Sequence, residues 1–162
     1  MNFLWNSFWG KILMTFLLSM VPVIELRGAI PIATEVHELN FWVAIFVSVI
    51  GNMLPVPFII VFIRNIFDWM RKKMPALNGI VTKLEQKAEK HKDKVLKYEF
   101  WGLFLLVAIP LPGTGAWTGA LVAAMLDMQL KRAVPAIFLG VVGAAAIVSF
   151  VTLAAPALMQ IF

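Results

Sequence analysis

Two charged side chains, Glu25 and Arg27, stand inside the stretch VPVIELRGAIPIATE, residues 21–35, whose other residues are apolar up to Ala33. An arginine can hold a phosphate group through forked hydrogen bonds, and a partly buried glutamate can bind and release a proton. The alternative is a fixed ion pair that only locks the local structure. Residues spaced i,i+2 point to different sides of a regular helix, so a direct pair requires a bend, which Gly28 and Pro31 could supply.

A second group of residues interrupts the apolar segment IPLPGTGAWTG, residues 109–119. Prolines remove backbone donors and glycines add conformational freedom, so a regular helix cannot continue through this segment. The interruption comprises Pro110, Pro112, Gly113, Thr114 and Gly115. The backbone amides freed at Gly113, Thr114 and Gly115 could help Arg27 to bind an anion. In a third apolar segment, Asn52 either lines a cavity or caps a kink before Pro55.

The composition indicates the elements that position these groups. The chain has 162 residues, of which 61% are hydrophobic and 14% charged, and a mean hydropathy of +0.88. These values indicate an integral membrane protein and exclude a large soluble catalytic domain. The sequence contains no nucleophile–base set, no metal-ligand cluster and no P-loop lysine, so we expect no enzymatic activity, no metal and no cofactor.

The charges are distributed unevenly. Between Arg64 and Glu99 there are ten basic and five acidic residues, whereas the rest of the chain has four of each. Basic segments that flank membrane helices mark the cytoplasmic side, so we expect residues 64–99 to be cytoplasmic and to include an amphipathic surface helix. Acidic residues alternate with the lysines and aromatic residues are not interleaved, so no nucleic-acid partner is expected.

The apolar segments define an all-α integral membrane protein. We expect an interfacial helix at 1–10, a re-entrant hairpin at 11–37, a transmembrane helix at 40–63, a second re-entrant hairpin at 100–126 and a transmembrane helix at 133–162. The segment from Lys11 to Ile24 has about fourteen residues, too few to cross a bilayer of about 30 Å, although the N-terminal segment could instead cross completely. In hydrocarbon, a broken helix is tolerated only within protein or beside a water-filled cavity.

The two hairpin-plus-helix units form a predicted internal repeat. An offset of 88 residues aligns Pro22 with Pro110. One crossing separates the hairpins, so they enter from opposite faces and the repeats are inverted. Inverted repeats with broken helices are the architecture of many secondary transporters, whose substrate sites lie near the bilayer midplane.

Two motifs, ELRGAIP at residues 25–31 and IPLPGTGAWTGALVAA at residues 109–124, resemble the small multidrug export protein family. That family is itself similar to the DedA/VTT superfamily of re-entrant-loop membrane proteins. The resemblance covers nearly the whole chain in layout and implies re-entrant hairpins related by inverted symmetry. For DedA relatives it implies transport of polyprenyl phosphate. Glu25 matches the acid of the DedA first hairpin, but Thr114 follows Pro112-Gly113 where DedA proteins have an acid, and the second hairpin lacks their arginines.

Three functional classes follow for a multi-pass protein of a prokaryotic cell membrane. The first is proton-coupled translocation of an anionic lipid carrier such as polyprenyl phosphate. The second is proton-coupled export of small lipophilic cations, and the third is a non-transporting assembly or scaffold protein. The expected partners are the lipid bilayer and a lipid or small-molecule substrate, and the sequence leaves a homodimer open.

Overall fold

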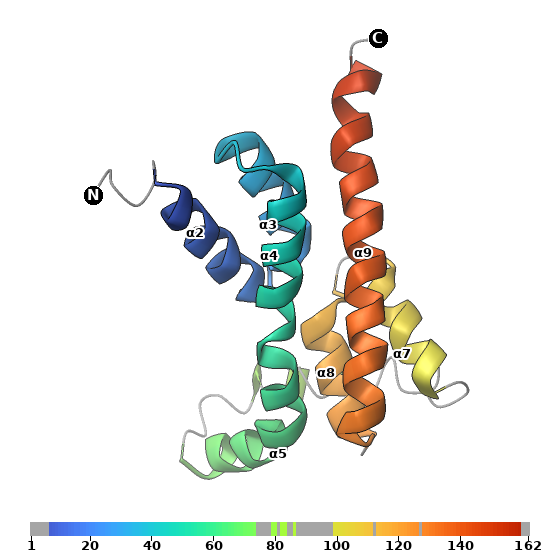
Figure 1. Cartoon of the computed structure of the whole chain (residues 1–162). Helices are drawn as coiled ribbons and strands as arrows, with labels where there is room; N and C mark the ends of the chain where they lie inside the picture. Colours follow the sequence, from blue (N-terminus) through green and yellow to red (C-terminus); the bar gives the residue numbers. More distant parts are fainter. Residues whose placement is uncertain are drawn as a thin grey trace. The chain divides into compact units, whose positions relative to one another are not determined.

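Every element of the computed structural model is helical in the residues that it describes, which are 7–73, 79–80, 82–83, 86, 99–111, 113–126 and 128–159. The helices are α2 (Phe8–Met20), α3 (Glu25–Pro31), the π-helix η1 (Ile32–Val36), α4 (Phe41–Met53), α5 (Pro55–Lys73), α7 (Glu99–Ala108), α8 (Ala116–Met125) and α9 (Leu130–Met159). Figure 1 shows their order along the chain. The predicted all-helical architecture is therefore confirmed for the described residues.

Two helical stretches are long and apolar enough to cross a membrane, Phe41–Ile63 with 23 residues and Leu130–Ala154 with 25. At 1.5 Å per residue, the first spans about 34 Å, slightly more than a hydrocarbon core of about 30 Å. Large apolar side chains are exposed along both, among them Phe46, Phe58 and Phe150. Such side chains suit contact with lipid tails. Pro55 begins α5 directly after Leu54, which separates α5 from α4.

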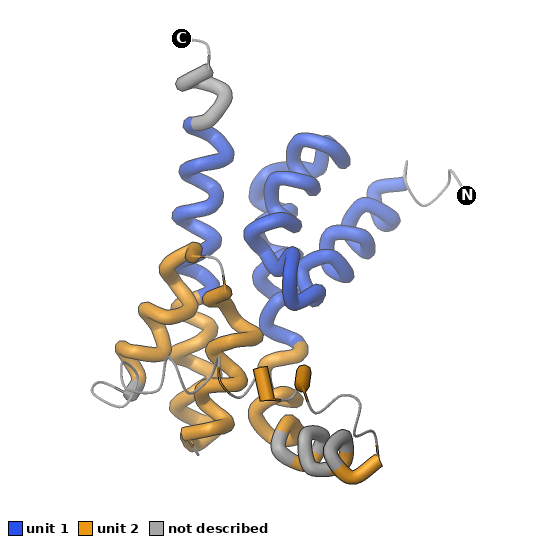
Figure 2. The backbone as a smooth tube through the Cα atoms, turned by 180° about the vertical axis from the view of Figure 1, so that it is seen from behind, with its two compact units in different colours: residues 1–54, 141–162 blue, residues 55–140 orange. Residues whose placement is uncertain are grey.

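The chain divides into two compact units, residues 1–54 with 141–162, and residues 55–140 (Figure 2). In the first, α2, α3 and α4 pack against one another. The α2 helix ends at Met20 because the chain turns at Val21-Pro22-Val23 before α3 begins. Pro31 lacks a backbone donor, and beyond it the helix widens to π spacing, with the His37 amide bonded to the Ile32 carbonyl at 3.1 Å.

The second unit packs α7 and α5 against α8 and contains the first part of α9. Val107 of α7 lies between two glycines. A Cβ placed on Gly119 of α8, or one placed on Gly140 of α9, would lie 2.6 Å from a side-chain atom of Val107. Glycine at these positions therefore permits the close approach of three helices.

The helix ends repeat along the sequence. The last residues of α2 and α7 are Met20 and Ala108, and the first residues of α4 and α9 are Phe41 and Leu130. The separations are 88 and 89 residues. Positive φ angles recur with the same offset, at Glu25 (48°) and Gly113 (86°). The left-handed residue is the first residue of α3 in one segment and lies in the turn before α8 in the other.

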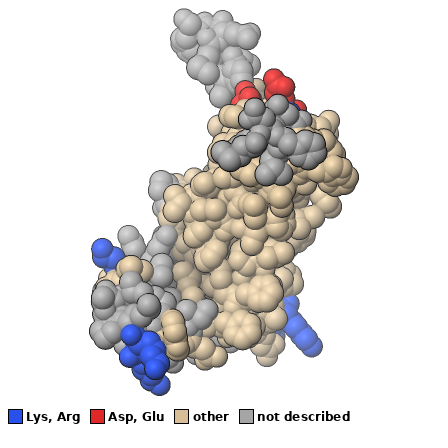
Figure 3. All heavy atoms as spheres, turned by 90° about the vertical axis from the view of Figure 1, so that its left-hand side faces the viewer, with Lys and Arg blue, Asp and Glu red and all other residues tan. Residues whose placement is uncertain are grey.

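Charged side chains lie beyond both ends of the apolar stretch Phe41–Ile63. The exposed Glu35 and Glu38 precede α4, and the exposed Lys72 and Lys73 end α5. Figure 3 shows acidic side chains gathered in one patch and a broad area without charge. Most of the predicted interfacial segment 1–10 and of the predicted surface helix in 64–99 lies outside the described residues, as does Pro112.

Candidate functional site

The acid and the base of the first hairpin contact each other. Nη1 of Arg27 donates to Oε2 of Glu25 over 3.4 Å, at the long end of hydrogen-bond distances. Glu25 is only 4% exposed, and Arg27 is partly buried. A carboxylate with so little solvent requires a nearby positive charge, because burial of an unpaired charge costs several kcal/mol or more. The pair has no net charge when both groups are ionised.

The bend that permits this contact occurs at Glu25 itself. Its φ of 48° lies in the left-handed region, and its amide donates to the Val21 carbonyl at 2.9 Å. The sequence prediction placed the bend at Gly28 and Pro31, which is wrong, since both residues lie within α3. The chain reverses at residues 21–24, so the first residue of α3 must adopt the unusual angle. A side chain other than glycine in this region costs about 1 kcal/mol.

Two polar side chains on the buried face of α4 lack partners. Asn52 is 1% exposed, and neither its Oδ1 nor its Nδ2 has a hydrogen-bond partner among the described residues; the same holds for Oγ of the buried Ser48. By contrast, the Thr15 and Ser19 hydroxyls of α2 donate to carbonyls of their own helix at 2.8 and 2.7 Å. Asn52 therefore does not cap the break before Pro55, and its role as a cavity-lining residue stays a prediction.

Glu25 and Asn52 are each eight residues from one core cluster. Ala33 and Ala44 belong to one core cluster, and α3 packs against α4. The four residues 37–40 join these two helical stretches, which run in opposite directions (Figure 1). Glu25 precedes Ala33 by eight residues and Asn52 follows Ala44 by eight, which places each about 12 Å from that cluster. Asn52 is also the middle residue of the stretch Phe41–Ile63, with eleven residues on each side.

The second hairpin satisfies much of its own backbone. The Thr114 hydroxyl donates to the carbonyls of Ile109 and Leu111 at 2.8 and 2.9 Å, and its amide donates to Leu111 at 3.1 Å. The Thr118 hydroxyl donates to the Gly113 carbonyl at 3.0 Å. The predicted use of the Thr114 amide for anion binding is therefore wrong, because the turn closes on that amide. Gly113 and Gly115 have φ of 86° and 139°, which explains why glycine occupies these positions.

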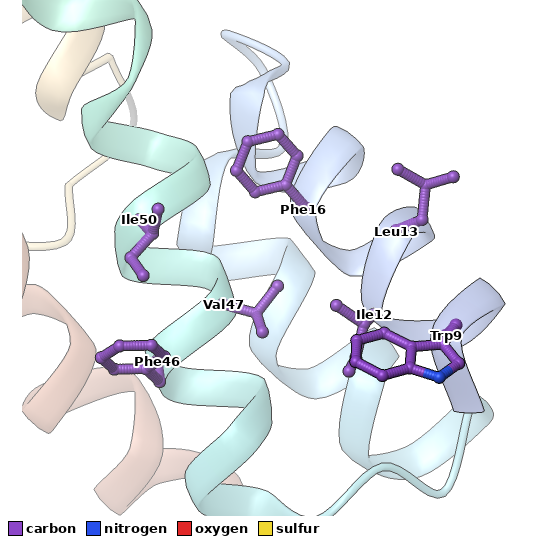
Figure 4. A pocket seen from close by; sticks show the side chains of 7 residues that line it. All are labelled: Trp9, Ile12, Leu13, Phe16, Phe46, Val47 and Ile50. Atoms are coloured by element: carbon purple, nitrogen blue, oxygen red, sulfur yellow. The ribbon is translucent and has the colours of Figure 1, made fainter.

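An apolar groove of about 370 Å³ lies between α2 and α4. Figure 4 shows side chains from both helices around it. The lining residues are Trp9, Ile12, Leu13, Phe16, Phe46, Val47 and Ile50. Gly51, the next residue of α4, packs against Ser19 Oγ and the Phe16 carbonyl. The groove and the buried polar face of Ser48 and Asn52 thus occupy different sides of the same helix.

The structure places the predicted residues in two groups. Glu25, Arg27, Gly28, Pro31 and Asn52 belong to the first unit, and Pro110, Gly113, Thr114 and Gly115 to the second. Sequence reasoning missed Ser48 and Thr118. Ser48 stands one helical turn before Asn52, so the i,i+4 spacing of two polar residues in an apolar helix is the signal that could have identified it.

Comparison with known proteins assigns the chain to a family. The sequence profile described as "Putative small multi-drug export protein" matches residues 25–147, which is more than half of the chain. No curated protein and no solved structure matches the chain. With its two long apolar helices and this match, the chain is a membrane protein that belongs to the small multi-drug export protein family.

Proposed function

We propose that this protein is a transporter that exports small lipophilic cations across the cell membrane of a prokaryote. The observation that carries the proposal is Glu25, an ionisable side chain that is 4% exposed and lies in the same unit as the buried, unpartnered Asn52. Ionisable groups within the membrane segments of a protein are costly and mark transport pathways. The family description supports export as the activity.

The proposed topology contains two re-entrant hairpins related by inverted symmetry. The α2 helix has 13 residues and a length of about 20 Å, which is too short to cross the hydrocarbon core. The recurrence of helix ends and of a left-handed residue at nearly constant offset supports a repeat. On this topology, residues 64–99 are cytoplasmic because they carry the excess of basic residues.

The proposed mechanism exchanges a proton for the substrate at Glu25. A cation that approaches the carboxylate would displace the Arg27 contact, which is long at 3.4 Å. Protonation of Glu25 would then release the cation, because a neutral carboxyl group no longer attracts it. Ser48 and Asn52, which lie on the side of α4 away from the apolar groove, would offer neutral polar contacts to the substrate.

A second candidate is transport of an anionic lipid such as polyprenyl phosphate. The specific observation in its favour is Arg27, whose guanidinium group offers forked donors that match a phosphate. In this mechanism, Arg27 exchanges the Glu25 carboxylate for the lipid phosphate. The two candidates differ in which member of the pair binds the substrate, so single substitutions separate them.

The test uses purified protein in proteoliposomes with an imposed proton gradient. Uptake of a fluorescent lipophilic cation and binding of a polyprenyl phosphate are measured for wild type, Glu25→Gln and Arg27→Ala. Glu38→Gln is the matched control, because Glu38 also has a positive φ but is exposed. Cation export requires that uptake survives in Arg27→Ala and Glu38→Gln but is lost in Glu25→Gln. Lipid binding that only Arg27→Ala abolishes would establish the second candidate instead.

Activity toward neither substrate would favour a scaffold, the third class. That class makes the basic segment the working part of the protein. Deletion of most of residues 80–99 would then abolish function in cells, whereas a transporter would still bind its substrate.

A further inference from the structure

We propose that the end of α5 is a binding surface for anionic phospholipids, whose phosphate groups contact Lys72 and Lys73 beside Trp69. The α5 helix ends at Lys73, whereas the apolar membrane-crossing stretch ends at Ile63. The last part of the helix therefore continues beyond the hydrocarbon core. On the proposed topology, the lipids belong to the cytoplasmic leaflet. The inference depends on the membrane span and not on the substrate that the protein transports.

The last part of α5 changes direction after the membrane-crossing stretch. Figures 1 and 2 both show that the helix turns within its length, so that its end runs across the direction of its first part. A straight helix would carry Lys73 about 15 Å beyond Ile63, whereas the headgroup layer on each side of the hydrocarbon core is only about 5–7 Å thick. The turn thus keeps the end of the helix close to the lipid headgroups.

Four exposed residues in this part of α5 have the spacing i, i+4, i+7 and i+8, which places them on one face of the helix. They are Asn65, Trp69, Lys72 and Lys73. The Trp69 side chain is 56% exposed, although it is large and mostly apolar. Neither lysine forms an ion pair with a residue that the structure describes. This face therefore offers an aromatic ring and two ammonium groups to the membrane surface.

The chemistry of this face matches that of an anionic headgroup. Residues 64–73 contain four basic residues and one acidic residue, a balance of +3. Basic residues next to a membrane helix attract anionic lipids, and each one strengthens binding by about fivefold. Tryptophan rings prefer the level of the headgroups. Trp69 lies about 4.5–6 Å along the helix from the two lysines, so one lipid can contact the ring and an ammonium group together.

A simpler role for the two lysines is to stabilise the end of α5. Basic side chains near the C-terminus of a helix interact favourably with the helix dipole, but that role does not require a tryptophan on the same face. A second exposed basic pair, Lys131 and Arg132, begins α9 and has no tryptophan within two helical turns. This pair therefore provides a matched control for basic charge without the aromatic ring.

Lipid enrichment around a single fluorescent probe tests the proposal, because the chain has no cysteine of its own. The full-length Asn65→Cys variant carries a donor fluorophore in phosphatidylcholine nanodiscs. Energy transfer is measured to small amounts of phosphatidylglycerol or phosphatidylcholine that carry an acceptor on the acyl chain. Gln129→Cys is the control probe, because Gln129 is also exposed and lies beside Lys131. We expect transfer to favour phosphatidylglycerol at residue 65 more strongly than at residue 129.

Charge variants of the Asn65→Cys protein show whether the two lysines hold the lipid. Lys72→Gln with Lys73→Gln should weaken phosphatidylglycerol binding by about 25-fold, two factors of five, and added salt should weaken it in the parent protein. Lys72→Arg with Lys73→Arg keeps the charge and should retain binding. Lys131→Glu changes the net charge by the same two units as the glutamine pair and should leave binding at residue 65 unchanged.

Two results would overturn the proposal. Equal transfer at the two probes, or equal loss in Lys131→Glu and in the glutamine pair, would indicate a general attraction of anionic lipids to basic charge and refute a local site. The absence of any preference for phosphatidylglycerol at residue 65 would also refute it. The lysines would then serve the helix dipole or bind an acidic protein. The comparison of the two probes uses the native lysines, so it decides the question even if a charge variant does not fold.

Discussion

Replacement of Ser48 by alanine should stabilise the protein while it impairs transport. In a membrane, helices remain formed when they separate, and an isolated serine hydroxyl then bonds to a carbonyl of its own helix. In the folded structure, Ser48 is buried and its Oγ makes no hydrogen bond with a described residue. Ser48 therefore loses one hydrogen bond when the helices pack, at a cost of about 0.5–1.5 kcal/mol. Alanine has no hydroxyl group and avoids this cost, and it leaves a gap of only one atom.

The expected magnitude is a gain of about 1 kcal/mol in the free energy of unfolding, which is the value of the hydrogen bond that the serine loses on folding. Unfolding is followed in bicelles by thermal and denaturant titration. Thr15→Val is the matched control. Thr15 is equally buried, but its hydroxyl bonds to the Lys11 carbonyl within α2, and this bond exists in both states. We expect Thr15→Val to change stability by less than about 0.5 kcal/mol.

Asn52→Leu extends the test, since it removes a buried amide with two unpartnered atoms and keeps an apolar side chain of similar length. We expect the same sign as for Ser48→Ala, and a loss of substrate binding in both variants. A decrease in stability for Ser48→Ala beyond that of the control would show that the hydroxyl has a structural partner. The interpretation of these residues as a substrate site would then fail.

Three further predictions concern backbone positions. Gly51→Ala should destabilise the α2–α4 contact by about 1–3 kcal/mol, because the added Cβ would lie 2.6 Å from the Phe16 carbonyl oxygen. A backbone atom cannot move aside as a side chain can. An unchanged melting temperature would contradict this packing. Gly119→Ala should cost a similar amount through its Cβ contact with Val107 at 2.6 Å, and Val107→Ala in the same chain should restore part of the loss. Glu38→Gly should stabilise the protein by about 0.5–1 kcal/mol. This is the difference between the left-handed strain that glycine removes and the entropy that it adds to the unfolded chain. A decrease in the free energy of unfolding, measured by thermal and denaturant titration, would refute the backbone angle assigned to Glu38.

The sequence predicted the helical class, the two long apolar helices and the broken segments, because apolar length and proline–glycine content are local properties. The contact of Glu25 with Arg27 was one of the arrangements that the sequence left open. Its origin could not be predicted, since the left-handed angle of Glu25 results from the chain reversal at residues 21–24 and not from a residue type that favours it. Likewise, the hydrogen bonds of Thr114 depend on which carbonyl groups its hydroxyl reaches. The spacing of residues along the sequence does not specify these carbonyls.

The two hairpins have different residues at their positions with positive φ, and this difference bears on the site. Glu25 is the first residue of α3, and Gly113 lies in the turn before α8. Glycine adopts such an angle without steric cost, whereas glutamate retains a cost of about 1 kcal/mol. A backbone position that served structure alone would be better occupied by glycine in both hairpins. The glutamate in the first hairpin therefore has a role other than stability, which agrees with its burial beside Arg27. If the repeats are inverted, the ionisable chemistry comes from one half of the protein, and the second hairpin supplies a neutral, self-satisfied counterpart.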